Sequence, residues 1–163
     1  MRTIISLLLL FVFHFFAVGQ RVSYDDPDLT FSFKKPKNWE VFDNGYVVKL
    51  SPSVHDTSNT YFTITYFEDA SPLGVSKAPE IMQPEDYTVT ELPTPNVVEV
   101  GKYELQTGTT RAIIHQESYH QQRYLFNNYN QRWEIITSAP ESEKKKYEVI
   151  FKRVIKSLRI TQN

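Results

Sequence analysis

The sequence predicts an α+β protein: an antiparallel β-sheet flanked by helices, with a C-terminal amphipathic helix packed on the sheet. Two observations lead to this prediction. Beyond residue 20, much of the chain alternates aromatic or β-branched side chains with polar ones, a period of two that is typical of strands with one buried face. Near the C-terminus the apolar residues change to a helical period of 3.6.

The first segment of the chain predicts export. Arg2 precedes a mostly apolar run over residues 4–18, which ends in Ala17-Val18-Gly19, with small residues where a signal peptidase needs them. A spanning helix needs about 20 apolar residues, so the run is short for the alternative, an uncleaved membrane anchor. We expect a signal peptide over residues 1–19, cleavage before Gln20, and a periplasmic or secreted product. The chain has no cysteine to carry a lipid anchor.

The composition limits the classes of function. Without residues 1–19 the chain keeps 144 residues with 17 Lys and Arg against 19 Asp and Glu, which suits one domain, residues 20–163, with its own core. This near-neutral charge does not favour nucleic acid as a partner. The absence of cysteine excludes thiol catalysis, zinc–thiolate sites and iron–sulfur clusters. No cofactor is expected.

Alternating residues predict three strand regions in the N-terminal half. Thr30–Phe33 is the first strand, and a turn at Pro36–Trp39 ends it. Asp43-Asn44-Gly45 forms a tight turn, because Asn and Gly tolerate positive φ. The strand Tyr46–Leu50 follows that turn and is expected to pair with the first strand. Thr60–Phe67 is the clearest strand of all.

Prolines interrupt the pattern over residues 71–95, so no long helix is expected there. A single helical turn around 79–82 and a short extended piece at 87–90 fit the residues. Strand signals return at 96–100, 103–107 and 109–117, and then in a hairpin of 123–127 and 132–137 that turns at Asn128-Tyr129-Asn130.

The stretch from Ser138 to Ile160 predicts the C-terminal helix. Its start is given either by a capping box of Ser138 with Glu141 or by Pro140 as the first helical residue. One apolar stripe follows at helical spacing: Tyr147, Ile150, Phe151, Val154, Ile155 and Leu158. We therefore expect the helix to cover the sheet.

The other face of this helix is basic. It carries Lys144, Lys145, Lys146, Lys152, Arg153 and Lys156, offset by Glu141, Glu143 and Glu148. One interpretation is a surface that binds an acidic partner or an anionic membrane. The other is a solvated face whose lysines keep the protein soluble and complement the negative end of the helix dipole.

Both ends of the domain resemble the PsbP-like family. Phe31-Ser32-Phe33-Lys34-Lys35-Pro36-Lys37-Asn38-Trp39 is similar to the family's opening, an aromatic strand followed by Pro-x-x-Trp. A last strand that ends in Ser-Ala-Pro, followed by a helix with the tail Phe151–Leu158, is similar to its close.

This resemblance implies an α+β sandwich shared by photosystem accessory subunits, Mog-type factors and bacterial exported proteins, which mostly act by binding other proteins. It implies core roles for Trp39 and the C-terminal helix, and it transfers no catalytic residue. The proline-rich region departs from the family's longer helix after the third strand.

Tyrosines gather around the predicted hairpin and give a candidate partner site. Tyr119, Tyr124 and Tyr129 lie close in sequence to Arg123 and Arg132, and tyrosines with one wet end are common at recognition surfaces. The hypothesis is a protein- or glycan-binding patch. The alternative is that strands favour tyrosine in any case.

Two acidic or histidine clusters are candidate metal sites. His115 and Glu117 would alternate onto one strand face with His120 close by, a spacing that can place metal ligands together. Asp25-Asp26-Pro27-Asp28 offers carboxylates suited to Ca²⁺. The alternatives are ordinary surface residues for the first cluster and a frayed N-terminal segment for the second.

Known catalytic motifs are missing from the chain. It has no Gly-x-Ser-x-Gly nucleophile elbow and no clustered glycines that could cradle a phosphate. We predict a non-catalytic exported envelope accessory or protein-binding module, with another envelope or secreted protein as its partner. A metal- or small-ligand-binding periplasmic protein is the alternative, and a hydrolytic enzyme is less favoured.

Overall fold

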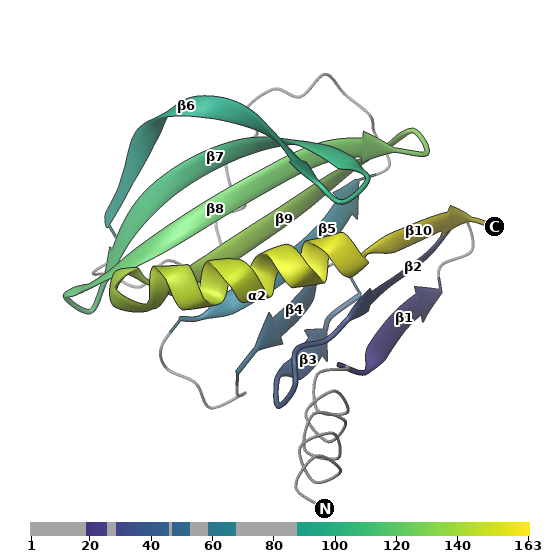
Figure 1. The fold of residues 1–163 in the computed structure, drawn as a ribbon, viewed down its shortest axis with the longest axis horizontal. Helices are drawn as coiled ribbons and strands as arrows, with labels where there is room; N and C mark the ends of the chain where they lie inside the picture. Colours follow the sequence, from purple (N-terminus) through teal and green to yellow (C-terminus); the bar gives the residue numbers. More distant parts are fainter. Residues whose placement is uncertain (1–18, 26–28, 46, 53–58, 68–87) are drawn as a thin grey trace, which may run out of the picture.

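The structure, a computed structural model, describes residues 19–25, 29–45, 47–52, 59–67 and 88–163. These residues form two antiparallel sheets and one α-helix, as the predicted α+β class requires (Figure 1). The strands are β1 Arg21–Asp25, β2 Leu29–Lys34, β3 Glu40–Asp43, β4 Val48–Ser51, β5 Tyr61–Phe67, β6 Thr88–Val100, β7 Tyr103–Ile114, β8 Glu117–Asn128, β9 Gln131–Pro140 and β10 Arg159–Gln162. A 3-10 helix, η1 Glu141–Glu143, leads into the α-helix, α2 Lys144–Ser157.

The large sheet has seven strands in the order β3-β4-β5-β9-β8-β7-β6. Its long strands are joined by two-residue turns at His115-Gln116 and Tyr129-Asn130, where all four residues have positive φ between 50° and 67°. Positive φ at both central positions matches the twist of the flanking strands. The turn predicted at residues 128–130 is therefore confirmed, whereas the strand predicted to run from 109 to 117 is interrupted at His115.

The small sheet has the order β1-β2-β10, and it corrects one predicted pairing. β2 contains Thr30–Phe33 and lies between β1 and β10, so it does not pair with the strand at residues 46–50. That strand, β4, pairs with β3 and β5 instead. The turn at Asp43-Asn44-Gly45 closes the β3–β4 hairpin, because the Gly45 N–H donates to Asp43 Oδ1 at 2.8 Å and φ of Gly45 is 83°.

Two prolines, Pro93 and Pro95, fall in a strand at an edge of the large sheet. The pairing of β6 with β7 shifts register between Leu92 and Asn96, the interval that contains Pro93 and Pro95. Proline has no N–H to give to a ladder, so it is confined to edge strands and bulges, and β6 is both. The extended piece predicted at residues 87–90 is confirmed from Thr88 onward, while the helical turn predicted at 79–82 lies outside the described residues.

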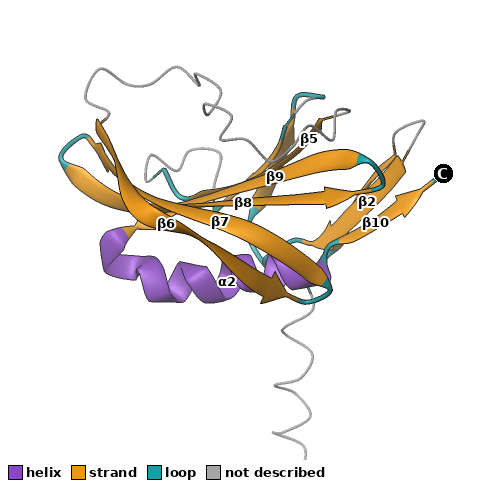
Figure 2. Cartoon of the chain, turned by 90° about the horizontal axis from the view of Figure 1, so that it is seen from above, coloured by secondary structure: helices purple, strands orange, loops and turns teal. Residues whose placement is uncertain are grey.

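Helix α2 covers one face of the large sheet, as expected from its apolar stripe (Figure 2). Four residues of the stripe are buried within the helix, Leu158 is buried just after it, and Ile150 is half-buried. The ring centroid of Trp39 lies 6.1 Å from those of both Tyr147 and Phe151. Trp39 and the C-terminal helix are therefore core elements, as the family resemblance implied.

Two details of the helix differ from the prediction. Ser138 is fully buried inside β9, which continues to Pro140, so Ser138 caps no helix. The 3-10 turn η1 comes first, and no side chain caps it or α2. Within the described ranges α2 is the one α-helix, so the expected flanking by several helices is not found there.

Candidate functional site

The tyrosines of the β8–β9 hairpin do not form one surface. Tyr124 faces α2, is 2% exposed, and donates its OH to Gln122 Oε1 at 2.6 Å; burial raises its pKa to about 12. Tyr119, on the opposite face, is equally buried. Tyr129 is exposed in the turn, and the guanidinium of Arg132 lies 4.7 Å from the ring centroid of Phe67. Partner binding by Tyr129 and Arg132 stays a prediction, and the buried Tyr124 is not available to it.

Arg123 has a structural contact on the sheet face turned away from α2. Its Nε forms an ion pair with the carboxylate of Glu134, its diagonal neighbour on β9. Glu134 is only 3% exposed, although it carries a charge. Because an isolated buried carboxylate costs several kcal/mol, the arginine is what allows an acidic residue in the middle of this sheet.

The predicted metal geometry is wrong. His115 lies in the β7–β8 turn and not on a strand face. Glu117 accepts a hydrogen bond from the Tyr119 OH at 2.8 Å, on the face opposite to the adjacent His120. His120 Nδ1 lies instead 3.9 Å from Glu141 Oε2, and burial, followed by the charge of Lys144, lowers its pKa. The described residues contain no group of three His, Asp or Glu placed to hold a metal ion.

The N-terminal acidic cluster is described only at Asp25, because residues 26–28 lie outside the described ranges. Asp25 ends β1, so the segment before it is an ordered strand and not a frayed end. Of the described helices, none is long and apolar enough to cross a membrane.

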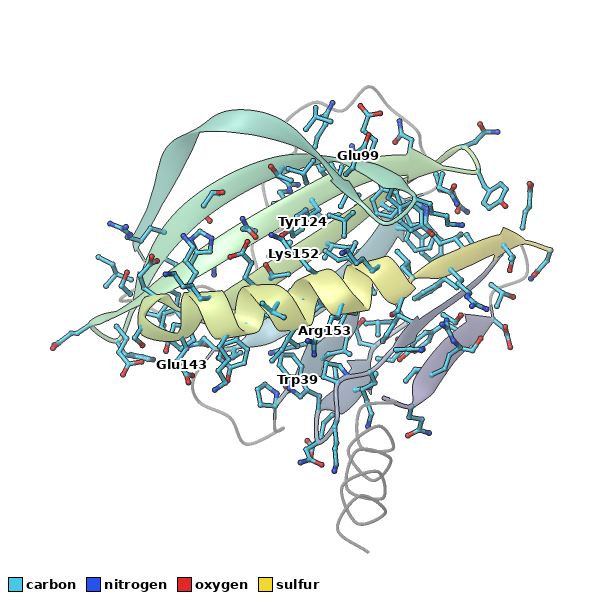
Figure 3. All side chains as sticks on the ribbon, viewed as in Figure 1. Trp39, Glu99, Tyr124, Glu143, Lys152 and Arg153 are labelled. Carbon is cyan, nitrogen blue, oxygen red and sulfur yellow. The ribbon has the colours of Figure 1, made fainter. Side chains whose placement is uncertain are left out.

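The basic face of α2 divides into a paired and an unpaired part. Lys144, Lys146 and Lys152 form ion pairs with Glu141, Glu143 and Glu148 at 3.9, 2.7 and 2.6 Å. The hydrogen bond from Lys152 also lowers the pKa of Glu148. By contrast, Lys145, Arg153 and Lys156 are exposed and form no ion pair with any residue that the structure describes. In Figure 3 Lys152 extends toward β8 and Arg153 toward the side of Trp39.

An open cleft of about 540 Å³ lies between β1 and β3. It is lined by Gln20, Val22, Lys35, Glu40, Val41, Phe42 and Ser51. The N–H of Lys35 donates to the Gln20 carbonyl at 2.8 Å, which holds the start of β1 at the rim. Phe42 on β3 is 58% exposed, and among the described strands β3 pairs with β4 alone, so it is an edge of the large sheet.

The sequence prediction missed this cleft and the strands that form it. β1 and β3 are five and four residues long; β1 alternates only Val22 and Tyr24 with polar residues, and β3 shows no alternation. Gln20 and Phe42 line the same cleft because β1 belongs to the small sheet and β3 to the large sheet beside it. No spacing in the sequence indicates that meeting.

Solved structures with the same fold identify the architecture. Cyanobacterial PsbP from Synechocystis sp. PCC 6803 aligns with a TM-score of 0.60 and 14% identity over 89% of this chain and 94% of its own. LpqN of Mycobacterium tuberculosis, which is involved in cell envelope biogenesis, aligns with a TM-score of 0.54 and 12% identity over 87% and 91%.

A Bacteroides thetaiotaomicron VPI-5482 protein aligns with a TM-score of 0.53 and 17% identity over 80% of this chain, which spans only 45% of that longer protein. No protein-family model and no curated protein sequence matches the chain. The likeness is therefore one of fold, and the fold is PsbP-like, as the motifs around Trp39 and in α2 indicated.

Proposed function

Because the chain has the PsbP-like fold, we propose that it is an exported, non-catalytic binding module of the cell envelope. Its site is the cleft beside β3, and its ligand is an extended segment of a partner protein. The involvement of LpqN, which shares the fold, in cell envelope biogenesis supports the compartment. The signal-like N-terminal run supports export.

The exposed edge of β3 is the observation that carries this proposal. An edge strand leaves a row of backbone N–H and C=O groups that an added strand can pair with, while side-chain pockets select its sequence. Phe42 offers an apolar contact at that edge, and Lys35 and Glu40 place one charge of each sign at the rim of the cleft. The cleft therefore combines backbone pairing with an anchor for one apolar side chain.

The test is affinity capture with crosslinking from the native cell envelope, with mass spectrometry to identify the partner. The bait is the tagged full chain, exported by its own N-terminal segment. Phe42→Thr should abolish capture while the melting temperature stays close to wild type. Val97→Thr is the matched control, because Val97 is also 58% exposed and also lies on an edge strand, β6, at the far side of the sheet.

Two results would overturn the proposal. One is a partner that Phe42→Thr retains as well as Val97→Thr does. The other is a hydrolytic activity of the purified protein that disappears with Glu117→Gln, which would refute the non-catalytic assignment.

A further inference from the structure

Six basic residues from four separate segments surround the C-terminal end of α2. We call them the basic cluster: Arg21, Lys34, Lys102, Arg153, Lys156 and Arg159. Arg21 Nη1 donates to the Ser157 carbonyl at 3.3 Å and to Ser32 Oγ at 2.9 Å. The Lys34 N–H donates to Ser157 Oγ at 2.8 Å. β1, β2 and the helix end therefore meet at Ser157.

The β6–β7 turn and β10 complete the cluster. A Cβ on Gly101 would lie 3.5 Å from the Cα of Lys156, so this turn touches the helix end, and Figures 1 and 2 both show it there. The ammonium of Lys102 lies 5.2 Å from the ring centroid of Tyr103, whose OH donates to the Leu158 carbonyl at 3.3 Å. Arg159 pairs in register with Ser32 on β2.

Among the described residues, no carboxylate forms an ion pair with these cations. None of the six forms an ion pair in the part of the chain that the structure describes, unlike the three lysines paired with glutamates on α2. Glu99 and Glu104 on the β6–β7 hairpin face away from α2, since the alternate residues Val100 and Tyr103 point into the core.

The basic cluster holds a third of the Lys and Arg residues of a chain that is nearly neutral overall. The chain has 18 Lys and Arg against 19 Asp and Glu, and six of the 18 lie in the cluster. The remaining 12 therefore face 19 acidic residues elsewhere. A protein that is almost neutral as a whole thus has one strongly positive pole.

Stabilisation of the helix explains only part of this pole. The carbonyls at the end of α2 favour a nearby cation, and Arg21 serves that role through its bond to Ser157. The field of a helix end falls off within one turn, and further unpaired cations at the same end repel one another. An external anion would relieve that repulsion.

We propose that the basic cluster docks the protein on the anionic phospholipid headgroups of a membrane surface. The cores of protein interfaces are enriched in aromatic side chains, whereas the one large apolar side chain that α2 exposes is Val149. The exposed, unpaired Lys and Arg residues suit a partner that offers repeated negative charge and needs no apolar core. Each basic residue near an anionic leaflet strengthens binding about fivefold. This docking does not depend on the partner segment proposed for the β3 cleft.

The test is co-sedimentation of the exported, purified protein with two kinds of vesicle: phosphatidylcholine alone, and phosphatidylcholine mixed with phosphatidylglycerol. Binding is expected only to the mixed vesicles, and added salt should weaken it. The triple variant Lys34→Gln/Arg153→Gln/Lys156→Gln should bind about 100-fold more weakly. These three side chains are exposed, so circular dichroism and the melting temperature should stay at wild-type values.

The matched control removes the same charge from the paired lysines, as Lys144→Gln/Lys146→Gln/Lys152→Gln. It should weaken binding far less than the cluster variant. Equal losses in the two variants, or no binding to the mixed vesicles, would overturn the proposal. Binding to soluble polyglutamate without binding to vesicles would overturn it in favour of an acidic protein partner.

Discussion

Replacement of Phe151 by alanine tests whether α2 completes the core. Phe151 is 4% exposed, and its ring centroid lies 6.1 Å from Trp39, 6.1 Å from Tyr147 and 6.4 Å from Phe62. Truncation of a buried Phe costs about 3–5 kcal/mol, from lost apolar burial and the cavity that remains. Three aromatic neighbours place the expected loss at the middle of this range or above, because each ring pair adds about 0.5–1.5 kcal/mol.

Urea denaturation, followed by far-UV circular dichroism and tryptophan fluorescence, measures the loss. Val149→Ala is the control on the same helix, because Val149 is 50% exposed and its truncation should change the free energy of unfolding by less than about 0.5 kcal/mol. If Phe151→Ala does not fold, Phe151→Leu should still show a loss of about 1 kcal/mol. A Phe151→Ala loss below about 1 kcal/mol would refute the role of α2 as the cover of a packed core.

Two further predictions concern buried charge. Glu134→Gln removes the carboxylate that pairs with Arg123 and should lower the free energy of unfolding by about 1–3 kcal/mol in the same urea assay. The double variant Arg123→Met/Glu134→Met should recover most of the lost free energy. A larger loss in the double variant than in Glu134→Gln would contradict this. Burial and Lys144 lower the pKa of His120 below 6.5, so the unfolded chain binds a proton first as pH falls. The free energy of unfolding should therefore decline from about pH 7 down through the lowered pKa, and His120→Asn should flatten that decline.

The candidate sites were harder to predict than the elements that carry them. Tyr124 and Arg123 are adjacent in sequence, but neighbours on a strand point to opposite faces, so one is buried under α2 and the other pairs with Glu134. His115 was placed on a strand because His-Gln carries none of the Asn or Gly signals that mark most tight turns. The first error arose because proximity in the chain was taken for proximity in space, and the second because the turn lacks the usual turn residues.

Most of the secondary structure follows from local periodicity in the sequence. The alternation in β2 and the stripe on α2 indicate which side chains are buried, because each pattern has one geometry that places them on one face. The absence of cysteine and the signal-like start were equally plain in the sequence.

The pairing of the strands could not be read from the sequence. The alternation in β2 fits a pairing with any of several strands, β4 among them. In the structure β2 pairs instead with β10, about 130 residues later in the chain. That choice brings Arg21, Lys34 and Arg159 to the end of α2 and opens the cleft beside Phe42. The β2–β10 pairing depends on contacts between residues far apart in the chain, and the spacing of residues within a strand does not show these contacts. Both proposed binding surfaces result from this pairing.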